Sequence, residues 1–370
     1  MGIVTYKYKP LGFKIFCTLL LVQYLVPEEY QVPFVSLILI VCLYLYISFS
    51  LKHNNTNLHE ITSLMIIPFI LLIGFACGTF HASMVVVVLT IPAILLFNKI
   101  DFEINVTNKK YLRYISYCCL IGIILQMIFY RYENRPRMGY EINLTGAYLF
   151  TFFLLADLLK SKLIKVFVIF LSLLLLSRLL ILAISFFYFV RLTKPMIRCI
   201  PFITRWRVLV LLFVSLTSVF SVVYVDIMGG SILSTTDDRS RLTTINDGSN
   251  YERFSINDKV ITSLVEGSDV HLWLGGYGDT VNNKLYVAEY GNMPHNEIIK
   301  SITQFGLLTT ILFFYITSAN FKKVVGRNNI EYILPLLLYT QIFWVRFTVV
   351  PSILMLTILF ILKLKSKDNG

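Results

Sequence analysis

The sequence contains few charged residues for its length. Only 15% of its 370 residues are charged, whereas 56% are apolar. Soluble domains carry about 25% charged and about 45–50% apolar residues. These two departures together exclude an ordinary soluble enzyme and a disordered scaffold. The sequence therefore predicts a protein embedded in a lipid bilayer.

Common metal-binding and nucleotide-binding motifs are also missing. The sequence contains no HExxH, no Walker A loop and no GxGxxG, and no two cysteines have CxxC spacing. These absences remove the support for structural zinc and for mononucleotide binding through such motifs. We expect no metal and no cofactor. The six cysteines are Cys17, Cys42, Cys77, Cys118, Cys119 and Cys199.

Long apolar runs fill most of the chain. A helix needs about 20 apolar residues, within a range of about 17–25, to cross the hydrocarbon core of a bilayer. This length predicts an all-α polytopic membrane protein with twelve spans, in a single membrane domain over residues 1–370. The predicted spans are 11–26, 34–51, 61–80, 84–98, 114–130, 142–159, 162–177, 179–193, 208–227, 297–318, 331–345 and 347–362.

Two apolar runs admit either one long helix or two short ones. Residues 163–190 contain only Lys165 and Arg178 as charged residues, and the run 330–362 poses the same question around Arg346. The segment 191–207 carries five basic residues and no acidic residue, which predicts a cytoplasmic location. That location requires an external turn at Arg178. The same logic places Arg346 at an external turn.

An orientation with both termini in the cytoplasm separates the charges by sign. The cytoplasmic segments then carry 22 basic and 6 acidic residues, and the external segments carry 11 basic and 15 acidic residues. The net charge of +12 thus divides into +16 inside and −4 outside. This follows the positive-inside rule. The excess of basic residues therefore needs no nucleic-acid partner.

One long polar segment, residues 228–294, is predicted to form an external loop between spans 9 and 10. Turn residues precede Arg253, and apolar residues at helical spacing predict an amphipathic helix over 254–265. Tyr277 lies in a Gly-Gly-Tyr-Gly sequence. That sequence is either an ordinary tight turn or a place where the backbone approaches a ligand closely.

The candidates for chemistry are polar side chains on the external face, because unpaired charge at membrane depth is costly and usually functional. Arg178 either reaches lipid headgroups or binds two oxygens of a phosphate. His295, between Pro294 and Asn296, is predicted at a helix N-terminus, where the dipole favours the neutral imidazole of a general base. The alternative is a surface histidine that caps the helix.

The order of these features resembles the O-antigen polymerase and O-antigen ligase superfamily, which are membrane glycosyltransferases acting on lipid-linked glycans. The resemblance covers about residues 160–320. The family's usual Ser-Arg-Gly is here Ser177-Arg178-Leu179. The other matching features are Gly248 to Arg253, Gly275 to Gly278, the His295-Asn296 pair, and Gly306 eleven residues after the histidine.

The resemblance implies a GT-C-like repeat-unit polymerase in a bacterial inner membrane, with its active face in the periplasm. The donor is a glycan on undecaprenyl diphosphate, and the acceptor is the non-reducing-end sugar of another lipid-linked repeat unit. Arg178 and Arg253 would stabilise the diphosphate. His295 would deprotonate the acceptor hydroxyl in an inverting, metal-independent transfer. The implied substrate-binding residues are Arg135, Arg137, Tyr277, Asn296 and Arg346.

The roles of four external arginines stay open. Arg135 lies eleven residues before Gly146, a spacing found in some polysaccharide polymerases. Arg131, Arg135, Arg137 and Arg346 either line a glycan groove or face headgroups.

Two other functions remain as alternatives. An O-antigen ligase would use the same arginine and histidine chemistry and transfer the glycan to lipid A-core. The compact chain and its unusual loop favour the polymerase. A transporter of another class, such as a flippase for lipid-linked oligosaccharides, is disfavoured because the spans show no inverted repeat and no obvious broken helix. A chain-length regulator is a further partner implied by the resemblance.

Overall fold

The computed structural model describes most of the chain as far as Arg198 and short stretches after it. Before that residue it covers 6–7, 10–26, 28–53, 58–76, 82–101, 106–129, 131–132, 135–136, 142–175 and 177–198. After it, the described residues are 255–256, 258–259, 261–262, 265–266, 273–274, 299, 302, 306–312, 315, 331–332, 334–335, 357, 360–361 and 363–364.

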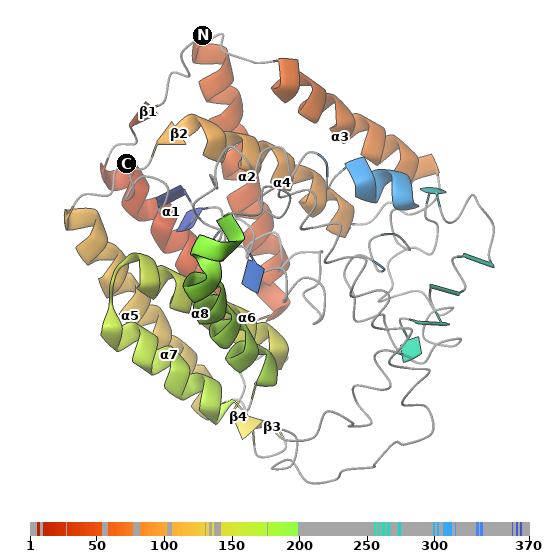
Figure 1. Ribbon diagram of the computed structural model, residues 1–370. Coiled ribbons are helices and arrows are strands. Elements are labelled where there is room, and N and C mark those ends of the chain that lie inside the picture. Colours follow the sequence, from red (N-terminus) through yellow and green to blue (C-terminus); the bar gives the residue numbers. More distant parts are fainter. Residues whose placement is uncertain are drawn as a thin grey trace.

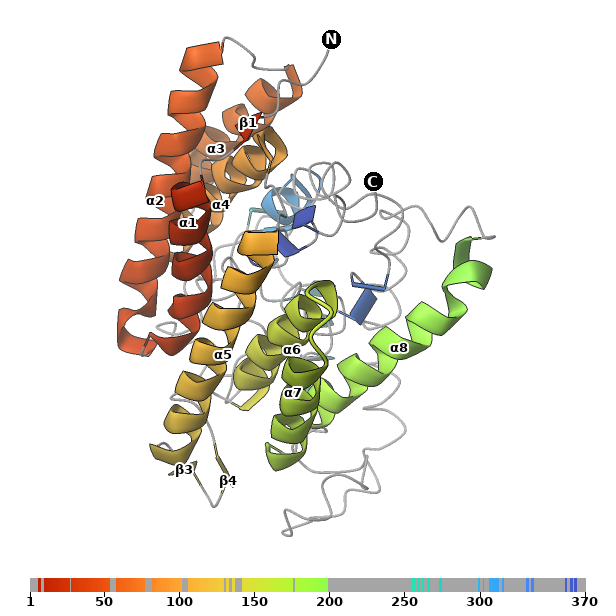
Figure 2. The ribbon, with the colours of Figure 1, turned by 90° about the vertical axis from the view of Figure 1, so that its left-hand side faces the viewer.

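The described part is almost entirely helical (Figures 1 and 2). The elements up to Arg198 are α1 (Pro10–Val22), the 3-10 turn η1 (Gln23–Leu25), α2 (Glu28–His53), α3 (Leu58–Ala76), α4 (Ala82–Lys99), α5 (Val106–Phe129), α6 (Ile142–Leu158), α7 (Lys162–Leu174) and α8 (Arg178–Arg198). Two short strand pairs complete them. The parallel pair is β1 (Tyr6–Lys7) with β2 (Ile100–Asp101), and the antiparallel pair is β3 (Arg131–Tyr132) with β4 (Arg135–Pro136).

Each of the first eight predicted spans coincides with one of these helices. Within the described residues, three stretches are long and apolar enough to cross a membrane: Pro33–Leu51, Val106–Phe129 and Leu179–Met196. The other apolar helices are shorter. The helices are those of an all-α, membrane-embedded protein.

The long apolar run 163–190 divides into two helices, as the charge argument predicts. α7 ends at Leu174, and α8 begins at Arg178. The far boundary of α8 corrects the sequence analysis, which placed residues from Arg191 onward in a connecting segment. The helix continues to Arg198 because arginine and lysine favour the helix and do not end it, and Arg191 and Lys194 pair with buried carboxylates.

The described residues of the tenth predicted span, 297–318, are helical. Gly306 has a φ of 79°, a left-handed value that an α-helix interior does not allow and that glycine adopts readily. Gly306 is the first of the helical residues 306–312. In the long loop, all eight described residues between 255 and 266 are helical, as the amphipathic pattern predicts.

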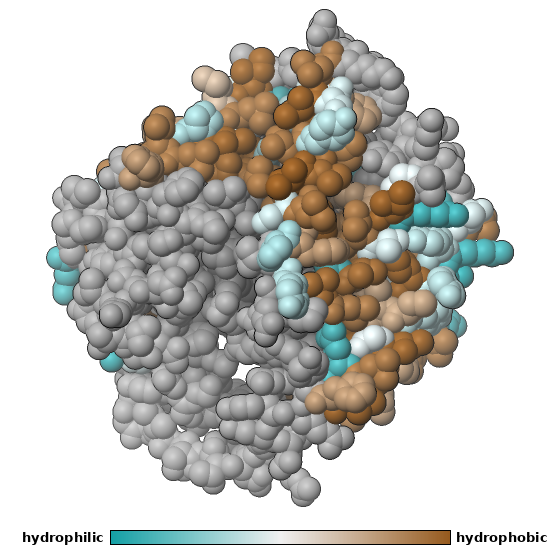
Figure 3. Space-filling model, turned by 180° about the vertical axis from the view of Figure 1, so that it is seen from behind, coloured by the Kyte–Doolittle hydropathy of each residue, from teal (hydrophilic) through white to brown (hydrophobic). Residues whose placement is uncertain are grey.

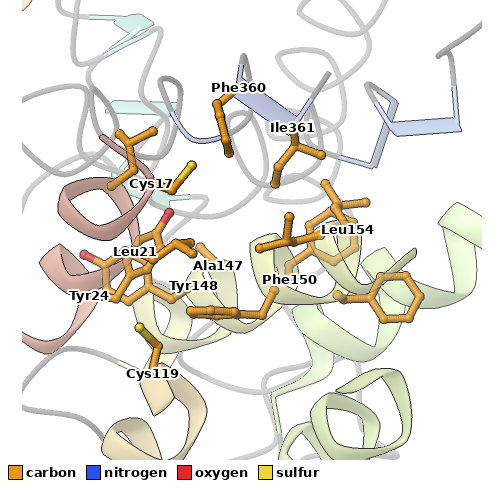
Figure 4. Close-up of a cluster of buried hydrophobic side chains, with 14 of the residues drawn as sticks. Cys17, Leu21, Tyr24, Cys119, Ala147, Tyr148, Phe150, Leu154, Phe360 and Ile361 are labelled. Atoms are coloured by element: carbon orange, nitrogen blue, oxygen red, sulfur yellow. The ribbon is translucent and has the colours of Figure 1, made fainter. Parts of the chain in front are cut away.

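The core joins α1, α5 and α6 through apolar and aromatic side chains, with Phe360 and Ile361 of the C-terminal stretch packed against them (Figure 4). Tyr24 lies at its centre, with its ring centroid 4.5 Å from that of Tyr148. α5 approaches η1 closely at Gly122, where an added Cβ would lie 2.8 Å from the Leu25 side chain. A side chain at this position would force the Leu25 side chain to shift.

Apolar side chains also cover much of the described outer surface (Figure 3). In a soluble protein such a surface would be unusual. In a bilayer it faces lipid. Exposed apolar residues on α2, α3, α5 and α7 include Leu37, Ile40, Tyr44, Met65, Leu72, Ile121, Leu125, Val166 and Phe170.

The helix bundle has two ends, which differ in the residues that they carry. The tight turn at Leu159–Ser161 reverses the chain, so that α7 packs antiparallel beside α6. We call the end that carries this turn the Asp157 end. The opposite end carries the β3–β4 hairpin, the end of α7 and the start of α8, and we call it the Arg178 end (Figures 1 and 2).

Candidate functional site

Arg178 occupies the first position of α8, directly after a buried serine. The Ser177 carbonyl accepts a hydrogen bond from the Ile181 backbone N–H at 3.2 Å, and its hydroxyl lies 3.4 Å from the Leu180 nitrogen. Ser177 is therefore the N-cap of α8. A helix N-terminus attracts anions through its free N–H groups and its dipole. A cation at this position adds to the attraction for anions, whereas a carboxylate would cancel it.

The β3–β4 hairpin brings two further predicted arginines to the same end. It begins two residues after α5, and Tyr132 pairs with Arg135 across the strands. Arg131 pairs with Pro136 in the same register. The backbone thus places Arg131, Arg135 and Arg178 at one end of the bundle, as the predicted topology requires.

The other predicted site residues lie outside the described residues. They are Arg137, Arg253, Tyr277, His295, Asn296 and Arg346.

Sequence reasoning missed a cluster of charged residues at the opposite end. Its centre is Asp157, which is buried near the C-terminal end of α6 with a side chain only 4% exposed. Arg191 of α8 binds both carboxylate oxygens, with Nη1 donating to Oδ1 at 2.9 Å and Nη2 donating to Oδ2. This is the bidentate geometry in which a guanidinium pairs most strongly with a carboxylate.

Two more donors complete the environment of Asp157. Lys165 of α7 donates to Oδ1, and the Tyr332 hydroxyl donates to Oδ2. The guanidinium of Arg191 also stacks on the Phe187 ring, 4.6 Å from its centroid. One carboxylate therefore joins three helices and residue 332, which follows it by 175 positions.

A second ion pair lies beside this cluster. Lys194 of α8 donates to Glu331 Oε1 at 2.7 Å, and the Glu331 side chain is 4% exposed. Further along the same end, Lys99 of α4 and Glu60 of α3 pair at 2.8 Å, with side-chain exposures of 12% and 8%. In the part of the chain that the structure describes, the buried ion pairs thus lie at the Asp157 end.

One signal in the sequence pointed to this cluster. Asp157 falls inside the predicted span 142–159, and an acidic residue at such a depth needs a partner. The identity of the partners depends on which helices are neighbours, which the sequence does not state.

Comparisons of the chain with protein-family models, with curated proteins and with solved structures find no match.

Proposed function

We propose that the protein is a polysaccharide repeat-unit polymerase of the O-antigen type, with twelve spans and a GT-C-like fold in a bacterial inner membrane. Both termini lie in the cytoplasm, and the Arg178 end faces the periplasm. The enzyme transfers a glycan from undecaprenyl diphosphate to the non-reducing-end sugar of another lipid-linked repeat unit. Each transfer forms one glycosidic bond and releases one undecaprenyl diphosphate.

The start of α8 carries this proposal. An arginine at a serine-capped helix N-terminus combines a guanidinium with free backbone N–H groups, and both suit the oxygens of a diphosphate. Charge develops on that diphosphate as the bond between its oxygen and the anomeric carbon of the glycan breaks. Donors fixed in advance around it lower the barrier.

The remaining roles rest on the sequence resemblance. Arg253 shares the diphosphate, and His295 takes the proton of the acceptor hydroxyl. Arg135, Arg137, Tyr277, Asn296 and Arg346 contact the glycans. A chain-length regulator is the expected protein partner.

A deletion strain of the source bacterium tests the proposal on a single gel of its lipopolysaccharide. Loss of a polymerase leaves lipid A-core capped by one repeat unit. Uncapped core with lipid-linked polymer would identify a ligase instead. Repeat units trapped on the inner leaflet would identify a transporter.

The transporter has one observation in its favour. Discontinuous helices form the substrate sites of many transporters, and Gly306 in the tenth predicted span has a left-handed φ of 79°. Replacing Gly306 by alanine would strain this backbone. If the protein transports, the variant should accumulate repeat units on the inner leaflet; if it polymerises, repeat units should still reach the periplasm.

A further inference from the structure

The Asp157 cluster lies at the end of the bundle opposite Arg178, yet the two are joined by one helix. Arg178 and Arg191 are thirteen residues apart in α8. At about 1.5 Å per residue, this separation spans about 20 Å. Any shift or rotation of α8 at Arg191 is therefore carried to Arg178, because a regular helix moves as a unit over this length.

The contacts of Arg191 hold α8 against both a shift and a rotation. A bidentate pair fixes the direction of the guanidinium as well as its distance, since both N–H···O bonds must be made together. Phe187 holds the same face of α8 from the side, because its ring contacts Tyr332 at 5.5 Å and 90° and Phe153 of α6 at 5.2 Å and 89°. Lys194, nearly one turn further, is tied to Glu331.

Proline defines where this held segment ends. Pro195 has no N–H, so the helical hydrogen bond to the carbonyl of Arg191 is missing and the helix is weakened there. The stretch from Arg178 to Arg191 contains no proline and no glycine. Arg191 is thus the last residue of the uninterrupted segment that begins at Arg178.

We infer that Asp157 is a positioning residue for the transfer reaction. Through Arg191 it sets the height and rotation of α8, and so places Arg178 at the diphosphate. This inference rests on the proposed function. A misplacement of about 1 Å can lower a rate on the order of 100-fold, so a distant carboxylate suffices to control the step.

Spin-label distances combined with repeat-unit extension test this inference. Labels are attached to cysteines at Leu51 of α2 and Leu182 of α8, both exposed, in the full chain in lipid nanodiscs after replacement of the native cysteines. Leu182 lies one turn from Arg178, which stays intact. A second pair of labels, at Leu51 and at Leu125 of α5, is the control because neither label lies on α8.

In the Asp157→Asn variant, we expect the distance between the labels at residues 51 and 182 to shift, or its distribution to broaden, by about 1.5 Å or more. This value is the rise of one helical residue. The 51–125 distance should not change, and extension should fall at least tenfold. Asp157→Glu should restore part of the parent 51–182 distance and part of the extension. Lys99→Gln, which breaks a buried ion pair between α3 and α4 at the same end, should change neither the distance nor the extension.

If the Asp157→Asn variant fails to insert, Arg191→Lys replaces it in the same measurements, because it keeps the charge and loses only the bidentate geometry. Reduced extension with an unchanged 51–182 distance would overturn the inference, as would a changed distance with full extension. If the parent chain extends no repeat units, the proposed function fails, and the distances still show whether Asp157 holds α8.

Discussion

The two ends of the helix bundle use positive charge differently. At the Asp157 end, Arg191 and Lys165 are bound to an internal carboxylate, and Lys194 is bound to a second one. At the Arg178 end, the arginine is the first residue of α8, at a helix N-terminus, where an anion is favoured. Paired cations join helices, whereas a cation at a helix N-terminus is suited to bind an anionic group from outside the chain.

The largest expected effect belongs to the proposed base, His295. Replacing His295 by alanine should lower extension on the order of 10²–10⁴-fold, the usual contribution of general acid–base catalysis. Protein level and insertion should stay normal. His271→Ala, inside the predicted loop 228–294 that precedes His295, is the matched control and should extend normally. Long polysaccharide in the His295 variant would remove this residue from the mechanism.

Removing the carboxylate at the Asp157 end should cost stability as well as extension. Asp157→Ala leaves Arg191 and Lys165 without their partner, and breaking a buried ion pair costs about 3–5 kcal/mol. We expect about 3 kcal/mol, the lower end of that range, because Arg191 and Lys165 are 35% and 20% exposed and can turn toward water. Thermal unfolding in detergent measures the effect. A change below 1 kcal/mol would mean that the cluster contributes little.

The arginine at the start of α8 should be sensitive to geometry even when its charge is kept. Arg178→Lys retains the cation and loses the planar fork that binds two oxygens. We expect extension to fall about 10- to 100-fold, less than the about 100- to 1000-fold loss on deleting a transition-state donor. Lys162→Arg at the other end is a suitable control. Full activity in Arg178→Lys would reject bidentate phosphate binding.

The smallest expected effect lies in the turn between α6 and α7. Lys160 has a φ of 52°, a left-handed conformation that costs a non-glycine residue about 1–2 kcal/mol. The backbone hydrogen bonds from Ser161 to Ala156 at 2.9 Å and from Lys160 to Asp157 at 3.1 Å form the helix end that glycine prefers. Lys160→Gly should therefore raise the unfolding temperature slightly. A lower unfolding temperature would show that the lysine itself stabilises this turn.

The sequence predicted the positions of the first eight helices better than their ends. Hydropathy windows detect the apolar part of a helix, so they missed the polar first turns of α5, which begins at Val106 instead of 114. The break before Arg178 was predictable because the positive-inside rule counts charges and needs no contacts. The left-handed conformation of Gly306 was not predictable, because glycine is also tolerated inside membrane helices.

The candidate site was predictable to a different extent at each end. Local patterns placed Arg131, Arg135 and Arg178 together, since alternating spans put both of their segments on one side. The partners of Asp157 come from α7, α8 and residue 332. Their meeting depends on long-range packing, which spacing along the chain does not encode.

The central claim is that the protein joins lipid-linked repeat units by chemistry at the Arg178 end. Its most direct test is extension by the purified chain in vesicles that contain undecaprenyl-diphosphate-linked repeat units. We expect products longer than one repeat, with one undecaprenyl diphosphate released for each bond formed. Arg178→Ala should abolish both the longer products and the release of undecaprenyl diphosphate, and Lys99→Gln should abolish neither. No product from the parent chain, or equal product from Arg178→Ala, would contradict the account.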